Sequence, residues 1–281
     1  MKLRGHHAVV TGGGTGIGAA IAQALGAEGA RLTLVGRRIK PLEEVADRIR
    51  SSRAKSRDPV ERSGDTAAET GLGSARQDVS TSLDTNGVSV AAVDVTRRGE
   101  VERAFALARE AQGPITILVN NAGAAAGIPF AKVTAEIWSG MMAVNLDGMF
   151  HCCQAALPDL LAAPAGRIVT VASMAGLHGF AYASPYIAAK HGAVGLTRAL
   201  AAEFARTNLR VNAVCPGFVD TEMTVQSVSN IAQKTGRSEE TAREELARLN
   251  PSGRLISPAV VAASVLDLVV SERNGEAVEI A

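Results

Sequence analysis

Tyr186 and Lys190 are four residues apart, a spacing that could place a phenol beside an ammonium. Residues four apart in a helix lie on the same face, so the two side chains would be neighbours. A tyrosine with its ordinary pKa of about 10 is a poor base at neutral pH, and a nearby positive charge lowers that pKa by favouring the phenolate. The pair therefore predicts acid–base chemistry at an alcohol or carbonyl oxygen.

A third polar side chain, Ser173, follows a short apolar segment thirteen residues before Tyr186. In an open α/β sheet the carboxyl ends of the strands face the ligand crevice. A serine hydroxyl at such an end can hydrogen-bond a substrate carbonyl. We therefore expect Ser173 to act beside Tyr186 and Lys190.

A glycine-rich segment near the start of the chain, Thr11 to Gly18, lies between an apolar strand-like run and a helical pattern. Glycines permit a tight turn and a close approach of the backbone to a pyrophosphate, and the following helix offers free N–H groups and its positive dipole end. This position predicts dinucleotide binding. The residues expected to contact the dinucleotide here are Gly12, Gly14, Thr15, Gly16, Ile17 and Gly18.

The end of the second apolar run bears on which dinucleotide is bound. NAD-selective folds usually place a carboxylate there for the ribose 2′-hydroxyl. This chain instead has Gly36, Arg37 and Arg38. Arginine suits a 2′-phosphate because its planar fork makes paired, charge-assisted hydrogen bonds. The sequence favours NADP, with NAD as the open alternative.

Short apolar runs alternate with segments of helical periodicity along most of the chain. Strands alternating with helices predict βαβ units and a parallel sheet, and hence a single Rossmann-type, doubly wound α/β domain over residues 1–281. Strands are expected at 7–11, 31–35, 88–95, 115–119, 167–173, 209–214 and 276–280, and helices at 18–29, 41–50, 100–112, 138–161, 184–207 and 258–270.

Two polar segments interrupt this alternation. Residues 51–87 show no apolar periodicity and are expected to form an inserted, mobile surface loop. Residues 222–250 keep a helical spacing of apolar residues and follow the expected nicotinamide site. We expect this second segment to be a lid over the substrate.

Composition excludes several classes of protein. The net charge of +1 gives no bulk field to attract nucleic acid or an anionic membrane. No apolar run reaches the roughly 20 residues of a membrane span, and the polar start does not resemble a signal peptide. The three cysteines, Cys152, Cys153 and Cys215, have neither disulfide nor metal-ligand spacing. We expect reduced thiols, no metal site and a cytoplasmic location.

Together these motifs resemble those of the short-chain dehydrogenase/reductase superfamily in its single-domain form. The resemblance runs over nearly the whole chain outside residues 51–87. The matching positions are the loop from Thr11 to Gly18, Asp94 and Val95, the Asn-Asn-Ala-Gly run of Asn120, Asn121, Ala122 and Gly123, the tetrad of Asn145, Ser173, Tyr186 and Lys190, and the segment with Pro216, Gly217, Val219 and Thr221.

The resemblance implies a role for each tetrad position. Tyr186 would be the general acid in reduction and the base in oxidation, while Lys190 would lower its pKa and hold the nicotinamide ribose. Ser173 would stabilise the substrate oxygen, and Asn145 would anchor a water that continues the proton path. The remaining matches imply contacts to the dinucleotide: Asp94 and Val95 at the adenine, Asn121, Ala122 and Gly123 along the cleft, and Pro216, Gly217, Val219 and Thr221 near the nicotinamide.

The substrate is less constrained than the reaction. The residues expected near it, Met174, His178, Phe180 and Tyr182, are mostly apolar, which fits a carbonyl flanked by an apolar group. His178 is either a ligand contact or an ordinary loop residue. The run from Asn250 to Leu255 resembles that of 3-oxoacyl reductases and 3-hydroxyacyl-CoA dehydrogenases, which implies a 3-oxoacyl thioester or a similar ketone.

Two further expectations follow from the resemblance. Helices at 138–161 and 184–207 pair across a two-fold axis in the family, which implies a homotetramer or a homodimer. Some proteins of such folds bind the cofactor and act as regulators without catalysis, because a fold does not fix a function. These commonly lack the tyrosine or the lysine, and both are present here.

Overall fold

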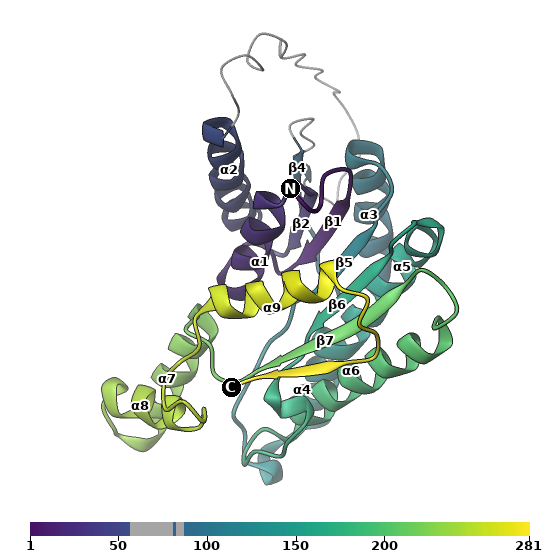
Figure 1. Ribbon diagram of the computed structural model, residues 1–281. Helices are drawn as coiled ribbons and strands as arrows, with labels where there is room; N and C mark the ends of the chain where they lie inside the picture. The colour runs from purple at the N-terminus through teal and green to yellow at the C-terminus, as the bar shows by residue number, and fades with distance from the viewer. Residues whose placement is uncertain (57–80, 83–86) are drawn as a thin grey trace.

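The computed structural model describes residues 1–56, 81–82 and 87–281 of the chain. Its centre is a sheet with the strand order β3-β4-β2-β1-β5-β6-β7-β8 (Figure 1). Every pairing in the sheet is parallel except that of β3 with β4. The strands are β1 (His7–Thr11), β2 (Arg31–Gly36), β3 (Thr81–Ser82), β4 (Val88–Ala92), β5 (Ile117–Asn120), β6 (Arg167–Val171), β7 (Arg210–Pro216) and β8 (Ala277–Ile280).

Helices cover both faces of this sheet, with α1, α2 and α9 on one face and α3, α5 and α6 on the other (Figure 1). The helices are α1 (Gly16–Ala27), α2 (Ile39–Ser56), α3 (Arg98–Gln112), α4 (Ala135–Met142), α5 (Gly148–Ala162), α6 (Ser184–Glu203), α7 (Glu222–Thr235), α8 (Glu239–Arg248) and α9 (Pro258–Val270). This arrangement confirms the predicted single-domain, Rossmann-type α/β fold.

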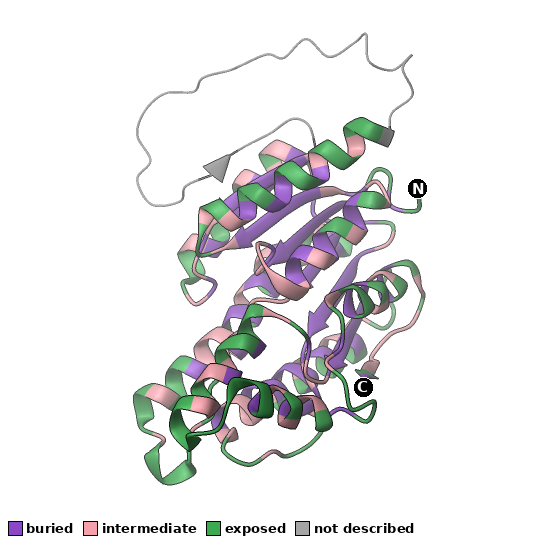
Figure 2. Cartoon of the chain, turned by 90° about the vertical axis from the view of Figure 1, so that its left-hand side faces the viewer, coloured by how far each residue is buried: buried purple, intermediate pink, exposed green. Residues whose placement is uncertain are grey.

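Strands β1, β5 and β6 are buried along their whole length, as their continuous apolar runs predict. In β1, Ala8 and Val10 belong to the core under α1 and α9, whereas Val9 belongs to the core under α3 and α5. Successive side chains of a strand point to opposite faces, so a single strand supplies both cores. Figure 2 shows the buried residues concentrated in the strands and on the inner sides of the helices.

The helix predicted at 138–161 differs from the structure. The chain forms α4, then a π-helical turn over Ala143–Asp147, and then α5. A π turn adds a residue to the helical repeat, and the apolar residues on either side keep a spacing that looks continuous. The turn contains Asn145, one of the predicted site residues.

The first of the two polar segments, residues 51–87, differs from expectation at its ends. Helix α2 continues to Ser56, because Arg53 anchors its last turns by donating to the carbonyls of Gly26 and Gly87. Residues 81–82 pair with β4, so this part of the expected insert is a strand. The rest of the predicted loop, residues 57–80 and 83–86, lies outside the described residues. Residues 222–250 form α7 and α8, which pack together through Val228, Ala242 and Leu246.

His7 at the start of β1 makes the fold sensitive to acid. Its buried ring bonds the Gly113 carbonyl through Nδ1 at 2.8 Å and the Thr33 hydroxyl through Nε2 at 2.9 Å, so the neutral ring has both nitrogens satisfied. Burial lowers the pKa of His7 to about 4. Between pH 6.5 and 4 the unfolded chain therefore binds a proton that the folded chain does not, and stability falls as the pH falls.

We expect His7 to contribute up to about 3 kcal/mol to this loss of unfolding free energy. Urea unfolding at pH 7.0 and pH 4.5, in wild type and in His7→Gln, measures it. The variant should lose less stability on acidification than wild type does. Equal losses in the two proteins would contradict the assignment to His7.

Candidate active site

The residues predicted from the sequence lie at the carboxyl ends of the parallel strands β1, β4, β5, β6 and β7. The order of the strands reverses between β1 and β5, because the chain builds outward from β1 on one side and from β5 on the other. Ligands of open α/β sheets bind in the crevice at such a switch point.

The glycine loop between β1 and α1 has a backbone conformation and a packing that require glycine. Gly12 and Gly16 have φ values of +64° and +50°, which a residue with a side chain rarely adopts. A Cβ atom on Gly18 would lie 2.1 Å from the Gly12 carbonyl oxygen, so the start of α1 packs directly against the loop. The Thr15 side chain does not cap α1, and no acidic residue lies in its first turn. The helix N-terminus therefore fits an anionic pyrophosphate.

Thr11 and Asn121 hold this loop against the end of β5. The Thr11 hydroxyl accepts hydrogen bonds from the backbone N–H groups of Asn121 at 2.9 Å and Ala122 at 3.0 Å. The Asn121 amide nitrogen donates to the carbonyls of Thr11 at 3.0 Å and Gly12 at 3.2 Å. The structure thus uses the Asn121 side chain to position the glycine loop, a role that the sequence did not indicate.

Asn145 fixes the next segment of the chain. Its side chain accepts from the N–H of Ala124 at 3.2 Å and donates to the carbonyls of Ala124 at 2.9 Å and Met141 at 3.1 Å. A Cβ atom on Gly123 would lie 2.8 Å from the Asn145 side-chain oxygen and 3.7 Å from the Lys190 nitrogen. The π turn therefore brings Asn145, Gly123 and Lys190 together.

Ser173, Tyr186 and Lys190 meet where β6 ends and α6 begins. The Lys190 nitrogen lies 5.7 Å from the centre of the Tyr186 ring, as expected for neighbours on one helix face, and donates to the Val171 carbonyl at 3.0 Å. The Ser173 side chain is near enough to the Tyr186 phenol to lower its pKa, and it accepts from the N–H of Ala175 at 3.1 Å. The three side chains can act on a single substrate oxygen.

The pKa values at this site differ from the sequence expectation. Burial raises the pKa of the Tyr186 phenol, and the hydrogen bond with Ser173 offsets only part of that rise. Burial also lowers the pKa of the Lys190 ammonium to about 8. The net pKa of Tyr186 therefore lies above its ordinary value, opposite to the direction that a neighbouring ammonium favours, because burial is the largest influence on it.

The segment after β7 is held against Asn250, which follows α8. A Cβ atom on Gly217 would lie 2.2 Å from the Asn250 side-chain oxygen, and the Gly217 N–H donates to the Ile280 carbonyl at 2.8 Å. Asn250 is buried and pairs with both the N–H and the carbonyl of Phe218, at 2.8 Å and 2.9 Å. The sequence singled out the run that begins at Asn250 but not this anchoring role.

Beyond Gly217 the same segment reaches the glycine loop. Val219 is buried and pairs with Ile256, which follows α8. Thr221 caps α7 by accepting from the N–H of Thr224 at 3.4 Å, and its methyl group lies 3.1 Å from where a Cβ atom on Gly16 would stand. Predicted residues from the two halves of the chain, Gly16 and Thr221, thus lie side by side.

Arg37, Arg38 and Asp94 lie at the ends of β2 and β4. Burial would raise the pKa of the Asp94 carboxyl, but hydrogen bonds from Thr96 and the charges of Arg37 and Arg97 outweigh it and hold the pKa below its usual value. Arg38 instead forms an exposed ion pair with Glu222 at 3.5 Å. The two guanidinium groups therefore face different partners.

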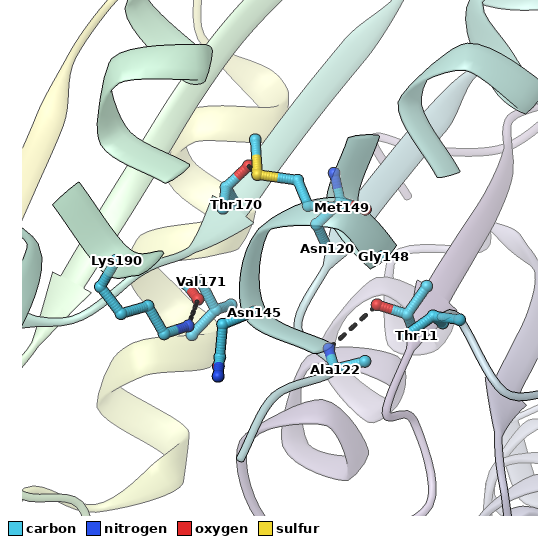
Figure 3. A pocket seen from close by; sticks show the side chains of 10 residues that line it. Thr11, Asn120, Ala122, Asn145, Gly148, Met149, Thr170, Val171 and Lys190 are labelled. Atoms are coloured by element: carbon cyan, nitrogen blue, oxygen red, sulfur yellow. Dashed lines mark hydrogen bonds between the residues drawn. The ribbon is translucent and has the colours of Figure 1, made fainter. Parts of the chain in front are cut away.

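A small cavity of about 10 Å³ lies between these segments, room for about one water molecule (Figure 3). The cavity is too small for a substrate. Its polar lining consists of Thr11, Asn120, Asn145, Thr170 and Lys190, and Val95, Ala122 and Gly148 are among the other residues around it.

The residues expected near the substrate differ in their burial and in their contacts. Met174 is buried, and its sulfur approaches Gly217. His178 is exposed and lies 3.4 Å from Glu279 in β8, which favours the loop role over ligand contact. Tyr182 is exposed with a φ of +63°, and its carbonyl accepts from the N–H of Ile128 at 2.6 Å. This bond joins the loop before α6 to the loop after β5.

In the described part of the chain, His, Cys, Asp and Glu side chains form no group that could hold a metal ion. Cys152, Cys153 and Cys215 are buried free thiols, and burial raises the pKa of Cys153 to about 12. None of the described helices has the length and apolarity that a membrane crossing requires.

Comparison with known proteins assigns the chain to a family. The short chain dehydrogenase model matches residues 6–70 and 68–232. A putative ketoacyl reductase of Streptomyces coelicolor is 34% identical over 264 residues, which cover 93% of this chain and 89% of that protein. The chain belongs to the short chain dehydrogenase family.

Two further similar proteins broaden the comparison. The D-beta-hydroxybutyrate dehydrogenase of Cupriavidus necator is 34% identical over 258 residues, covering 91% of this chain and 87% of that protein. A crystal structure of a point variant of the actinorhodin polyketide ketoreductase with NADPH has a TM-score of 0.81 and 31% identity, covering 98% of this chain and 95% of that one. As a member of this family, the chain is an NAD(P)-dependent oxidoreductase of the ketone–alcohol type.

Proposed function

We propose that this short chain dehydrogenase reduces the ketone of a 3-oxoacyl thioester, or a similar ketone, with NADPH. The observation that carries the proposal is the convergence of Ser173, Tyr186 and Lys190 at the sheet edge that also holds the glycine loop. The ketoacyl reductase and hydroxybutyrate dehydrogenase relatives act, by their names, on related oxo and hydroxy acids.

The chain offers a complete set of groups for a nicotinamide dinucleotide. The glycine loop and the N-terminus of α1 would hold the pyrophosphate, with Gly12, Gly16 and Gly18 giving the close approach. Arg37 and Arg38 would hold a 2′-phosphate, and Thr221, which lies beside Gly16, would contact the nicotinamide end. When bound, the nicotinamide supplies the hydride for the carbonyl carbon.

The protein residues act on the carbonyl oxygen. Ser173 donates a hydrogen bond to it and keeps it beside the Tyr186 phenol, which donates the proton that completes the alcohol. The raised pKa of Tyr186 keeps the phenol protonated at neutral pH, which suits reduction. The Lys190 ammonium, next to the ring, stabilises the phenolate that remains.

Steady-state kinetics with both cofactors tests the proposal. We expect kcat/KM at least about tenfold higher with NADPH than with NADH, because paired bonds to a phosphate contribute roughly one tenfold step or more. Acetoacetyl thioesters and cyclic ketones should be compared as substrates. A preference for NADH would overturn the cofactor assignment, and tight NADPH binding without turnover of any ketone would instead identify a regulator.

We also propose that copies of the chain assemble into a homotetramer or a homodimer. Helices α4 and α5 expose Trp138, Phe150 and Leu161, large apolar side chains that a partner subunit would cover. Light scattering on the purified protein at micromolar concentration should give the mass of two or four chains. The mass of a single chain would refute the assembly.

A further inference from the structure

The ion pair between Arg38 and Glu222 joins two parts of the chain that the sheet holds far apart. Arg38 lies two residues beyond β2, and Glu222 begins α7, six residues beyond β7. Their side chains meet at 3.5 Å, and both are about 70% exposed. An interaction between these positions is not a consequence of sequence proximity or of strand pairing.

The separation of the two strands shows how far the chain must reach. In the sheet, β2 and β7 are four strand spacings apart, about 19 Å at roughly 4.8 Å each. Residues 217–222 and the long side chains of Arg38 and Glu222 together bridge this distance, and the approach of Thr221 to Gly16 shows that the segment reaches the glycine loop.

Three segments approach one another around the start of α1: the glycine loop, the end of β2 with Arg38, and residues 217–222. The Arg38–Glu222 ion pair lies just beyond the end of β2, the place where a dinucleotide fold reads the ribose 2′ position.

The two arginines differ in their availability for that phosphate. The Arg37 charge helps to lower the pKa of the half-buried Asp94, which lies just beyond the end of β4. The Arg38 charge is already matched by Glu222, a carboxylate on a separate helix. A carboxylate and a phosphate are both acceptors for the guanidinium fork, so the two anions compete for the same donors.

We propose that Glu222 is a residue that sets cofactor choice, by competing with the 2′-phosphate for Arg38. Glu222 lowers the affinity for a 2′-phosphorylated nucleotide and leaves the affinity for the unphosphorylated nucleotide nearly unchanged. The inference rests on the proposed role of Arg38 in binding NADP. By this proposal, Glu222 at the start of α7 weakens the preference for NADP over NAD.

A structural role for Glu222 makes a different prediction. An acidic residue in the first turn of α7 interacts favourably with the helix dipole wherever Arg38 lies. Under that role alone, removing the carboxylate would weaken α7 and would affect phosphorylated and unphosphorylated nucleotides alike. The ratio of the two affinities therefore separates competition from helix stabilisation.

The test measures the binding of 2′,5′-ADP and 5′-AMP by calorimetry at about 50 mM salt, with the full chain freed of nucleotide. Glu222→Gln should bind 2′,5′-ADP about two- to fivefold more tightly than wild type does, the range expected for an exposed ion pair, and 5′-AMP equally. In an Arg38→Ala background the same substitution should have no effect on 2′,5′-ADP. Glu110→Gln, which removes an exposed carboxylate at the far end of α3, should leave both affinities unchanged.

Each result decides one of the two proposals. If wild type binds 2′,5′-ADP no better than 5′-AMP, the NADP assignment fails and the role of Glu222 fails with it. If wild type prefers 2′,5′-ADP but Glu222→Gln leaves the ratio of affinities unchanged, only the role of Glu222 is overturned. A gain that persists in the Arg38→Ala background would also overturn it, because general repulsion of the phosphate by Glu222 would then explain the gain.

Discussion

Tyr186→Phe should reduce turnover by about 10³-fold, the effect expected from removing a general acid. The phenylalanine ring can keep its place on α6 and its packing, but it has no proton for the carbonyl oxygen. Nucleotide affinity should stay within about threefold of wild type, because the glycine loop and the arginines do not contact this hydroxyl. Single-turnover oxidation of NADPH at 340 nm, with nucleotide titrations, measures both quantities.

The chain provides a matched control in its other tyrosine. Tyr182→Phe removes the same hydroxyl four residues earlier, at an exposed position of the loop before α6. We expect this variant to keep kcat within a few-fold of wild type, with any change falling on KM. A Tyr186→Phe enzyme that retains more than about a tenth of wild-type turnover would sink the assignment of Tyr186 as proton donor.

Gly18→Ala should lower both the stability of the protein and its affinity for the nucleotide. The new methyl group would lie 2.1 Å from the Gly12 carbonyl oxygen and 2.5 Å from the Asn121 amide nitrogen. The first of these atoms is backbone, and the second is held by two hydrogen bonds, so neither can move without opening the loop. We expect a loss of about 3 kcal/mol in unfolding free energy, at the upper end for overpacking, and at least about a tenfold loss of NADPH affinity.

Gly99→Ala is the control for this substitution. Gly99 lies in the first turn of α3, and an added Cβ would come no closer than 3.6 Å to the end of the flexible Arg103 side chain. Alanine is a better helix former than glycine, so stability should rise by up to about 1 kcal/mol. Urea unfolding of the two variants gives the comparison. If Gly18→Ala has the stability and the NADPH affinity of wild type, then the close contact of Gly18 with Gly12 and Asn121 is not required for folding or for nucleotide binding.

Local patterns in the sequence were enough to predict the layers of the fold. Continuous apolar runs such as 7–11 identify strands buried on both faces, and the spacing of Tyr186 and Lys190 places them on one side of α6. Motif spacing also predicted that Ser173 and Gly123 lie at the carboxyl ends of their strands, as they do after β6 and β5. These features depend on residues close together in sequence or on the regular geometry of parallel sheets.

What the sequence did not predict depends on contacts between distant residues. The π turn around Asn145 is invisible to a helical periodicity, and the role of Asn121 requires the loop that it holds. The pKa of Tyr186 moved opposite to expectation, because the degree of burial is a property of the folded site. The pairing of Arg38 with Glu222 requires that the segment after β7 reach the glycine loop.

The late strand β8 fastens two loops of the site at once. Ile280 accepts from the N–H of Gly217 after β7, and Glu279 pairs with His178 after β6. The glycine loop and Arg37 depend only on β1, β2, β4 and β5, whereas the loops after β6 and β7 are fixed only once β8 has paired with β7. We therefore expect the amides around the glycine loop to acquire protection earlier during refolding than those of the loops after β6 and β7.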